Sequence, residues 1–306
     1  MPEMDFQGEK RHLVTGAHAG KRVDKALTEL WPLVSRERWI ETLRDGDVEV
    51  DNMIAKPSLK LLIGSMIVIK RFPMPRLVDH AQIQPELTII YEDDDVIVID
   101  KPAGLIVHPT SRKGGVSVAG ALRDKVQDSD DLRPGIVHRL DQDTSGVMIV
   151  AKHSKAKQAL QQAFKARTVS KKYWALVWGE LGRGVQRLSF GLSRSVDHPG
   201  KIMIDPLGKP SETIVRQISN GEGVSLVEAE PITGRTHQIR VHLSAIKHPI
   251  VGDDSYGPKR GGAPRMMLHA HSLSLPLPSG KRQTFESPLP LDYLQTLEYY
   301  QCQIPH

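Results

Sequence analysis

Two carboxylates lie in a short polar loop that leads directly into an apolar segment. Residues 138–146 read His-Arg-Leu-Asp-Gln-Asp-Thr-Ser-Gly, and residues 147–151 read Val-Met-Ile-Val-Ala. A loop held in place by a buried strand is a frequent position for a reacting group. Asp141 could act there as a nucleophile or base, but Asp141 and Asp143 could equally cap the backbone amides of a turn. The residue types alone favour the turn, so this loop needs a second indication of chemistry.

A run of positive charge follows this loop. Residues 151–179 contain seven Lys or Arg residues and no Asp or Glu. Solvent-facing helices usually mix both signs, so the run favours a surface that faces phosphate groups. The net charge of +5 is consistent with a polyanionic partner.

The remaining composition excludes several classes of protein. No apolar run approaches the ~18 residues of a membrane helix, and the N-terminus lacks the apolar core of a signal peptide. Cys302 is the single cysteine, so we expect a cytoplasmic protein without an intrachain disulfide. The histidines lack metal-site spacing and no Gly-x-x-x-x-Gly-Lys-Ser/Thr loop occurs, so neither a metal nor a nucleotide cofactor is expected. The sequence makes no prediction of oligomeric state.

The N-terminal part has the pattern of a small domain. Apolar spacing predicts a helix over residues 22–31, and Ser35 is a suitable N-cap for a second helix that ends before Gly46. Alternating apolar residues follow at 48–50, 59–61 and 66–69. Prolines and scattered charges then indicate a linker, so we predict domains at 1–75 and 87–306, joined by residues 76–86.

The second region mixes strands and helices. A hairpin is predicted from residues 87–91 and 96–99, and strands at 147–151, 173–178 and around 273–277. Helices are predicted after Ser154 as N-cap and over residues 236–246. This order favours an α+β fold over a regular alternation of strand and helix.

A resemblance supplies the second indication for the loop. Residues 138–146 resemble the signature of the RluA family of pseudouridine synthases. Two further motifs follow the family order, Lys-Pro-Ala-Gly-Leu-Ile-Val-His-Pro at 101–109 and Gly-Arg-Thr-His-Gln-Ile-Arg-Val-His at 234–242, which leads into 248–253. The resemblance implies a catalytic domain with a central mixed, largely antiparallel sheet and flanking helices. It also implies an isomerisation that moves uracil from an N1 to a C5 bond with the ribose and needs no cofactor.

The same resemblance implies roles for individual residues. Asp141 corresponds to the catalytic nucleophile, and Arg240 to the basic residue that pairs with it. Tyr173 is similar to the tyrosine that stacks on the target base and takes part in proton transfer, and Leu268 to the apolar wall of the uracil pocket. Arg139 resembles the residue that fills the space left by the flipped-out uridine. Simple core packing is the alternative for Tyr173 and Leu268.

The N-terminal region resembles an S4-type RNA-binding domain. The matching stretches are residues 20–27, 35–38, 46–50 and 56–58. The resemblance implies that the second helix presents Arg36 and Arg38 to RNA. The chain has Asp51-Asn52 where the family commonly has Asn-Gly, and both residues tolerate the backbone of a tight turn.

These resemblances favour large-subunit ribosomal RNA as the substrate, because an added S4-type domain is typical of that branch of the family. Transfer RNA is the alternative substrate. Two other functions stay open: a catalytically silent RNA-binding or ribosome-assembly protein, and, with less support, a hydrolase built on Asp141 and Asp143. The presence of Asp141, Tyr173 and Arg240 together favours the enzyme.

Overall fold

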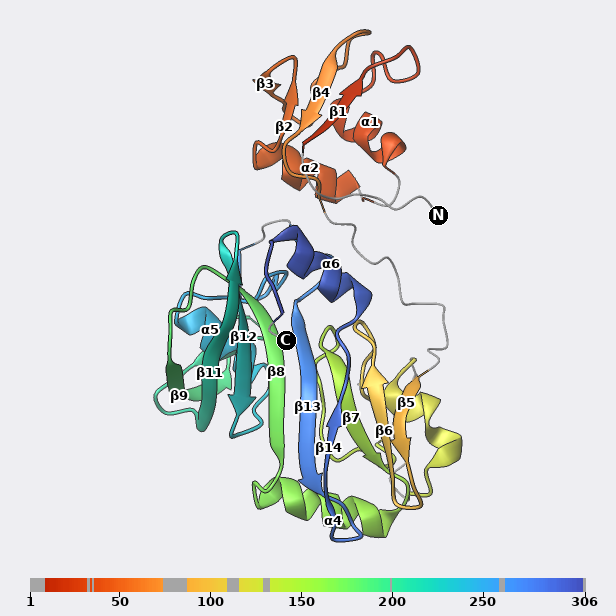
Figure 1. Cartoon of the computed structure of the whole chain (residues 1–306), viewed down its shortest axis with the longest axis vertical. Coiled ribbons are helices and arrows are strands. Elements are labelled where there is room, and N and C mark those ends of the chain that lie inside the picture. The colour runs from red at the N-terminus through yellow and green to blue at the C-terminus, as the bar shows by residue number, and fades with distance from the viewer. Residues whose placement is uncertain are drawn as a thin grey trace. The chain divides into compact units, whose positions relative to one another are not determined.

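The computed structural model describes residues 9–31, 34, 36–73, 87–108, 116–128, 133–198, 200–258 and 262–304. The chain divides into two compact units. One comprises Met1–Val78 with Pro258–Arg265, and the other Asp79–Gly257 with Met266–His306 (Figure 1). The predicted linker from 76 to 86 and the predicted N-cap Ser35 lie outside the described residues.

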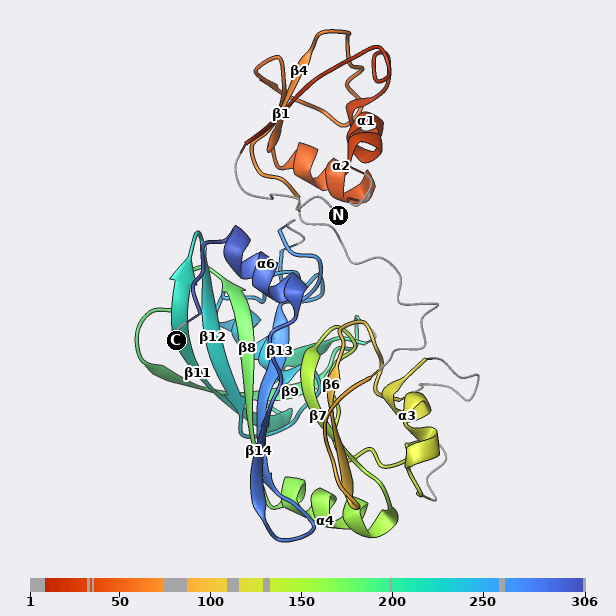
Figure 2. The same cartoon turned by 45° about the vertical axis from the view of Figure 1, so that its right-hand side comes forward.

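The N-terminal unit packs two helices against one face of a four-stranded antiparallel sheet (Figures 1 and 2). The strands lie in the order β1-β4-β2-β3. Trp39, Leu27 and Ile67 are fully buried in the core between the helices and the sheet. The elements are β1 (Lys10–Leu13), α1 (Val23–Leu30), α2 (Arg36–Arg44), β2 (Val48–Val50), β3 (Met53–Ile54) and β4 (Met66–Ile69).

Both predicted helices of this unit form, but one predicted strand does not. Asp51 and Asn52 adopt left-handed backbone angles (φ 52° and 65°) and connect β2 to β3, so this pair does make the tight turn. The strand predicted at 59–61 is wrong, because β2 pairs with β3 instead. Only Lys60 in that segment forms an isolated bridge, to Arg22.

The larger unit is built on one mixed sheet of ten strands, in the order β10-β9-β11-β12-β8-β13-β7-β6-β5 with β14 paired to β13. Every pairing is antiparallel except that of β7 with β13. The predicted α+β class and largely antiparallel sheet are therefore confirmed. The elements are β5 (Thr88–Glu92), β6 (Val96–Lys101), α3 (Val118–Ala121), a 3-10 turn (Arg123–Lys125), β7 (Ser145–Ala151), α4 (Ser154–Lys165), β8 (Ser170–Trp178), β9 (Val185–Arg194), β10 (Ile202–Ile204), β11 (Lys209–Gly221), β12 (Val224–Pro231), α5 (Gln238–Ala245), β13 (Leu268–Pro276), β14 (Arg282–Glu286) and α6 (Leu291–Tyr299).

Helices lie at both ends of the strands that form the middle of this sheet. In both views α4 crosses one end of β7, β8 and β13, and α6 lies toward the other end (Figures 1 and 2). All residues of β7 are buried, which fits its continuous apolar sequence. None of the described helices is long and apolar enough to cross a membrane.

Two helix starts in this unit differ from the prediction. Ser154 is the first residue of α4 rather than its cap, because the ring of His153 accepts the Ala156 amide hydrogen at 3.2 Å. Helix α5 begins at Gln238, two residues after the predicted start. His237 has φ 53°, and this left-handed backbone cannot belong to a right-handed helix.

Candidate active site

The register of β7, β13 and β8 brings three predicted site residues together. Ser145, at the start of β7, lies opposite His269 of β13, so Asp141 just before β7 lies near Leu268, the first residue of β13. On the other side of β13, Ala270 pairs with Tyr173 of β8. Three segments that are distant in the sequence therefore meet where β7 and β13 run parallel.

Gly146 allows this close approach. Its φ is +113°, and a Cβ atom at this position would lie 2.3 Å from the Ala270 carbonyl oxygen. Any other residue would force β7 and β13 apart. The glycine that ends the signature is thus needed for packing and not for chemistry.

Lys101 fixes the loop that carries Asp141. Its side chain is fully buried, and its ammonium group donates hydrogen bonds to the carbonyl oxygens of Pro102, Leu105 and Gln142 at 2.8–3.0 Å. The Gly104 amide also donates to the Gln142 carbonyl at 2.9 Å. A buried ammonium group needs these carbonyl oxygens to replace its water. Lys101 therefore fixes the position of Gln142, the residue next to Asp141.

His138, the first residue of the signature, also holds the loop in place. His138 Nε2 accepts the Ile149 amide hydrogen at 3.1 Å, and the ring stacks on Phe164. Burial, together with the charge of Lys171, lowers the pKa of His138 to about 3. His138 is therefore a neutral acceptor that ties the loop to β7.

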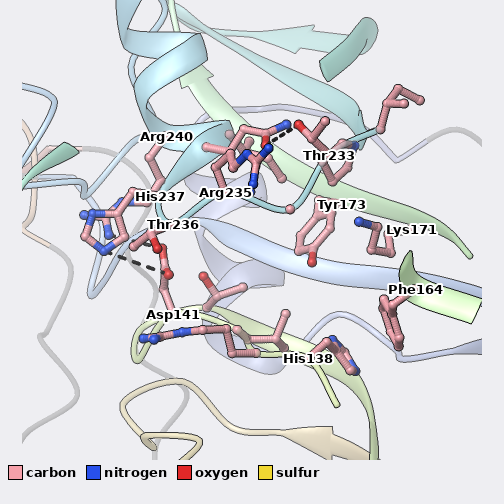
Figure 3. A pocket seen from close by; sticks show the side chains of 18 of the residues that line it. His138, Asp141, Phe164, Lys171, Tyr173, Thr233, Arg235, Thr236, His237 and Arg240 are labelled. Atoms are coloured by element: carbon pink, nitrogen blue, oxygen red, sulfur yellow. Dashed lines mark hydrogen bonds and ion pairs between the residues drawn. The ribbon is translucent and has the colours of Figure 1, made fainter. Parts of the chain in front are cut away.

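A pocket of about 450 Å³ opens at this junction (Figure 3). Asp141, His237 and Arg240 gather at one end, and Tyr173 and Lys171 lie toward the other. The five residues predicted to form the catalytic pocket and to enter the RNA all line it: Arg139, Asp141, Tyr173, Arg240 and Leu268.

Arg240 lies between two carboxylates. Its Nη1 donates to Asp141 Oδ2 at 3.2 Å, and its Nε and Nη2 donate to the two oxygens of Asp253 at 2.7 and 2.9 Å. Its guanidinium carbon also lies 4.9 Å from the centre of the Tyr256 ring. Burial alone would lower the pKa of Arg240, but the hydrogen bonds and charges of Asp253 and Asp141 outweigh burial and raise it. Because Nε and Nη2 of the guanidinium both donate to Asp253, Nη1 is the nitrogen that donates to Asp141.

Tyr173 offers an uncommitted hydroxyl to the pocket. Burial and, to a lesser degree, the Asp141 charge raise its pKa, so the phenol stays protonated at neutral pH. Its hydroxyl makes no hydrogen bond with another described residue. The ring can therefore contact a planar ligand while its proton is available.

Only part of the basic run reaches this pocket. Lys165 and Arg167 line its edge and are exposed. Lys152 and Lys157 instead form ion pairs with Glu92 and Asp128. Arg139 and Arg235, which lie outside this run, also line the pocket and are exposed.

The two arginines predicted to bind RNA in the N-terminal unit differ in exposure. Arg36 donates to buried Asp24 at 2.7 Å while its side chain stays 46% exposed. Arg38 is buried, with an ion pair to Glu41 and a hydrogen bond to the carbonyl of Ala263, in the segment that clusters with this unit. Arg36 is accessible to a partner, whereas Arg38 is committed to internal contacts.

Within the described part of the chain, no three His, Cys, Asp or Glu side chains gather as metal ligands. His242 is buried and its Nε2 lies 2.7 Å from the Ser211 hydroxyl, so it serves the packing of α5 on β11. The expectation that the reaction needs no metal stays a prediction.

The comparisons with known proteins agree with this site. Residues 95–245 match the family model for RNA pseudouridylate synthase. A ribosomal large subunit pseudouridine synthase D of Yersinia pestis is 36% identical over 304 residues, which cover 93% of this chain and 92% of that protein. The namesake from Nitrosomonas europaea is 38% identical, over 94% of this chain and 86% of its own length. This chain belongs to the RluA-type pseudouridine synthases.

Solved structures support the same assignment. The structure of human RNA Pseudouridylate Synthase Domain Containing 4 has a TM-score of 0.57 and 26% identity, and the match covers 72% of this chain and 95% of the human one. Human RNA Pseudouridylate Synthase Domain Containing 1 has a TM-score of 0.56 and 30% identity, with 69% and 87% covered. The chain is therefore an RNA pseudouridine synthase, an isomerase of uridine.

No role was assigned from the sequence to two residues that organise the synthase site, Asp253 and His237. Asp253 pairs with Arg240, the partner of Asp141, and His237 faces Asp141 itself. One signal could have identified Asp253. Burial of an arginine in a closed pocket costs solvation free energy, and a second carboxylate beside the guanidinium helps to offset that cost. No local pattern indicates His237, because its approach to Asp141 depends on how α5 packs.

Proposed function

We propose that this pseudouridine synthase modifies large-subunit ribosomal RNA, with Asp141 as the catalytic nucleophile. The observation that carries the proposal is the Asp141 carboxylate, held by Arg240 at 3.2 Å in a pocket that Tyr173 and Leu268 also line. Support for the substrate comes from the relatives named for the large ribosomal subunit, which match this chain over nearly its whole length.

The pocket suits the demands of the isomerisation. The N1–C1′ bond breaks, the C5–C1′ bond forms, N1 takes up a proton and the proton on C5 is released. No electron or phosphate donor is consumed, so the side chains alone suffice. Arg240 donates a hydrogen bond to the Asp141 carboxylate and directs it, the ring of Tyr173 stacks on the uracil, and Leu268 provides an apolar wall.

The uridine has to leave its stack to enter this pocket, which costs a few kcal/mol. Arg139 is exposed, lines the pocket and lies in the same loop as Asp141. An arginine can stack on bases and bind phosphate at once, so we assign Arg139 to the space that the uridine vacates. Lys165 and Arg167 contact the flanking phosphates.

We assign the N-terminal unit to the S4 type of RNA-binding domain, with α2 facing RNA. The half-exposed Arg36 supports this assignment directly. Arg38 would contact RNA only after leaving the Ala263 carbonyl, so its contribution to affinity is the smaller of the two. A ribosomal RNA substrate also implies that the enzyme works in the cytoplasm.

Release of tritium from RNA labelled at uridine C5 tests this proposal, because the C5 hydrogen is lost when C5 bonds to C1′. We expect the protein to release tritium from large-subunit ribosomal RNA transcripts and not from transfer RNA transcripts, in buffer containing EDTA. Release from transfer RNA alone would refute the substrate assignment. Binding of either RNA without any release would indicate a catalytically silent protein.

A further inference from the structure

The two oxygens of the Asp141 carboxylate face different side chains of the same segment. Oδ2 accepts the hydrogen bond from Arg240, whereas Oδ1 lies 3.9 Å from Nε2 of His237 (Figure 3). This second distance is longer than a hydrogen bond. A shift of less than 1 Å would close it, and contacts in catalytic sites often tighten only when the substrate is bound.

A neighbouring hydroxyl determines which nitrogen of His237 carries the proton. The Tyr256 oxygen accepts the Ile202 amide hydrogen at 2.7 Å and lies 2.8 Å from His237 Nδ1. Because the oxygen already accepts this amide, we assign the tyrosine proton to the contact with His237 and Nδ1 as its acceptor. The opposite tautomer would turn the Nε2 lone pair toward the Asp141 carboxylate and set two acceptors against each other. His237 thus presents an Nε2–H group to Asp141.

His237 is neutral when it does so. Burial lowers its pKa, and the charges of Arg240 and Arg139 act in the same direction. The negative charges of Asp141 and Asp253 oppose this effect without reversing it. A neutral donor directs the carboxylate without neutralising it, and Arg240 already supplies the compensating charge.

The backbone at His237 indicates that this position serves more than the helix. His237 is the N-cap residue of α5, but its side chain caps no amide of the helix. Its φ of 53° is uncommon for a non-glycine residue, although histidine, asparagine and aspartate adopt such angles more often than the others. Such conformations persist where the surroundings enforce them, and they cluster at functional sites. Here the left-handed turn accompanies a ring aimed at the pocket.

We propose that His237 is a positioning residue for catalysis: its Nε2–H donates a hydrogen bond to Asp141 Oδ1 once RNA closes the pocket. The carboxylate is then held by both oxygens, by Arg240 on one side and by His237 on the other. Tyr256 sets the tautomer and also lies against the Arg240 guanidinium. This inference rests on the proposed role of Asp141.

Two substitutions at His237 separate its donor from its bulk. His237→Asn fits the left-handed backbone but is too short to reach Asp141, whereas His237→Gln places an amide N–H near the position of Nε2. In single-turnover tritium release we expect His237→Asn to be about 10- to 100-fold slower, with RNA affinity within about twofold of wild type. His237→Gln should recover most of the rate, to within about fivefold of wild type.

Thermal unfolding of both variants serves as the control, and only variants that melt as wild type does are compared. A wild-type single-turnover rate in His237→Asn would overturn the proposal, as would a loss that lies entirely in RNA affinity. A Gln variant no faster than the Asn variant would overturn it too. Failure of the wild-type protein to release tritium would instead refute the proposed function, so the two failures are distinguishable.

Tyr256→Phe tests the tautomer independently. The substitution keeps the ring beside Arg240 and removes only the hydroxyl. We expect a rate loss of about threefold to tenfold, smaller than that of His237→Asn, because the imidazole can still adopt the productive tautomer part of the time. An unchanged rate would contradict the proposal that the Tyr256 hydroxyl sets the tautomer of His237. A loss larger than that of His237→Asn would also contradict it.

Discussion

Each unit contains a cluster of three charged side chains, and the two clusters have opposite composition. In the larger unit the buried cation Arg240 lies between Asp141 and Asp253. In the N-terminal unit the buried anion Asp24 lies between Arg22 and Arg36. The central residue is shielded in both, with exposed fractions of 11% for Arg240 and 0% for Asp24.

The clusters differ in what they present outward. The first has a net charge of −1 and presents one carboxylate, Asp141, 17% exposed inside a pocket. The second has a net charge of +1 and presents two guanidinium groups that are 42% and 46% exposed. A nucleophilic carboxylate has to be oriented toward its target and shielded from water. A side chain that contacts phosphate has to be exposed at the surface. The same kind of buried ion pair is thus suited to catalysis in one unit and to RNA binding in the other.

The largest effect is expected at the outward carboxylate of the first cluster. Asp141→Asn should reduce tritium release below about 1% of wild type, because the amide is a poor nucleophile and base. RNA affinity should stay within about twofold, since every basic contact remains. The matched control is Asp143→Asn in the same loop, where Asp143 is exposed and we expect activity within about threefold of wild type. Turnover of a few per cent in Asp141→Asn would reject the assignment.

The central cation gives the next effect. Removing one member of a buried pair typically costs ~3–5 kcal/mol, and each ~1.4 kcal/mol on the barrier is a factor of ten. Arg240→Met should therefore lower the rate by about two to four orders of magnitude. Arg240→Lys should recover only part of the rate, because an ammonium group lacks the two-pronged geometry. A wild-type rate in Arg240→Met would disprove the pairing.

Asp253 holds the Arg240 guanidinium that donates to Asp141, and this makes a sharper test. Asp253→Asn loses the charge-assisted fork, and we expect a rate about 10- to 100-fold lower. In a double-mutant cycle the losses of Asp253→Asn and Arg240→Met should not add, because both remove the same interaction. Additive losses would show that Asp253 acts elsewhere.

The N-terminal cluster should affect binding and not the chemical step. Arg36→Gln is expected to weaken RNA affinity about threefold to tenfold and to flatten its salt dependence by up to about one unit of slope. The single-turnover rate at saturating RNA should not change. Arg216→Gln, which breaks a similarly exposed pair with Glu228, is the matched control and should leave affinity unchanged. Equal effects of the two variants would remove the distinction between the clusters.

The smallest effect on turnover is expected at Asp24. Burial would raise its pKa, but hydrogen bonds from Arg22 and Arg36 outweigh burial and lower it. A lowered pKa means that the ionised group stabilises the folded state above its ordinary pKa and that this stability is lost as the pH falls. Asp24→Asn should therefore increase hydrogen exchange of the α1 amides at neutral pH, and the difference from wild type should shrink in acid. A difference independent of pH would contradict this account.

The sequence predicted which residues line the pocket better than it predicted how the pocket is built. The matched motifs led to Asp141, Tyr173, Arg240 and Leu268, and the structure places these side chains in one pocket. Motif positions transfer well because the reaction demands particular residue types. Only the structure explains why the motifs contain His138, Lys101 and Gly146. These residues hold the loop and allow the strands to pack closely.

Strands β6 and β7 were predicted from continuous apolar residues, whereas β9, whose burial is one-sided, was not. Strands β6 and β7 were evident because almost every side chain is buried. Strand β9 was not predicted, and its two buried leucines, Leu188 and Leu192, are four residues apart. That spacing is the one expected of a helix, so periodicity alone does not reveal this strand. Its pairing with β10 and β11 is a long-range property that the local sequence does not record.

The most direct measurement is a map of pseudouridines in total RNA from cells with this gene, without it, and with its Asp141→Asn form. We predict that one or more pseudouridines in large-subunit ribosomal RNA disappear without the gene. The wild-type protein should restore them, and the Asp141→Asn protein should not. Loss of modification in transfer RNA alone, or restoration by the Asp141→Asn form, would contradict the proposed function.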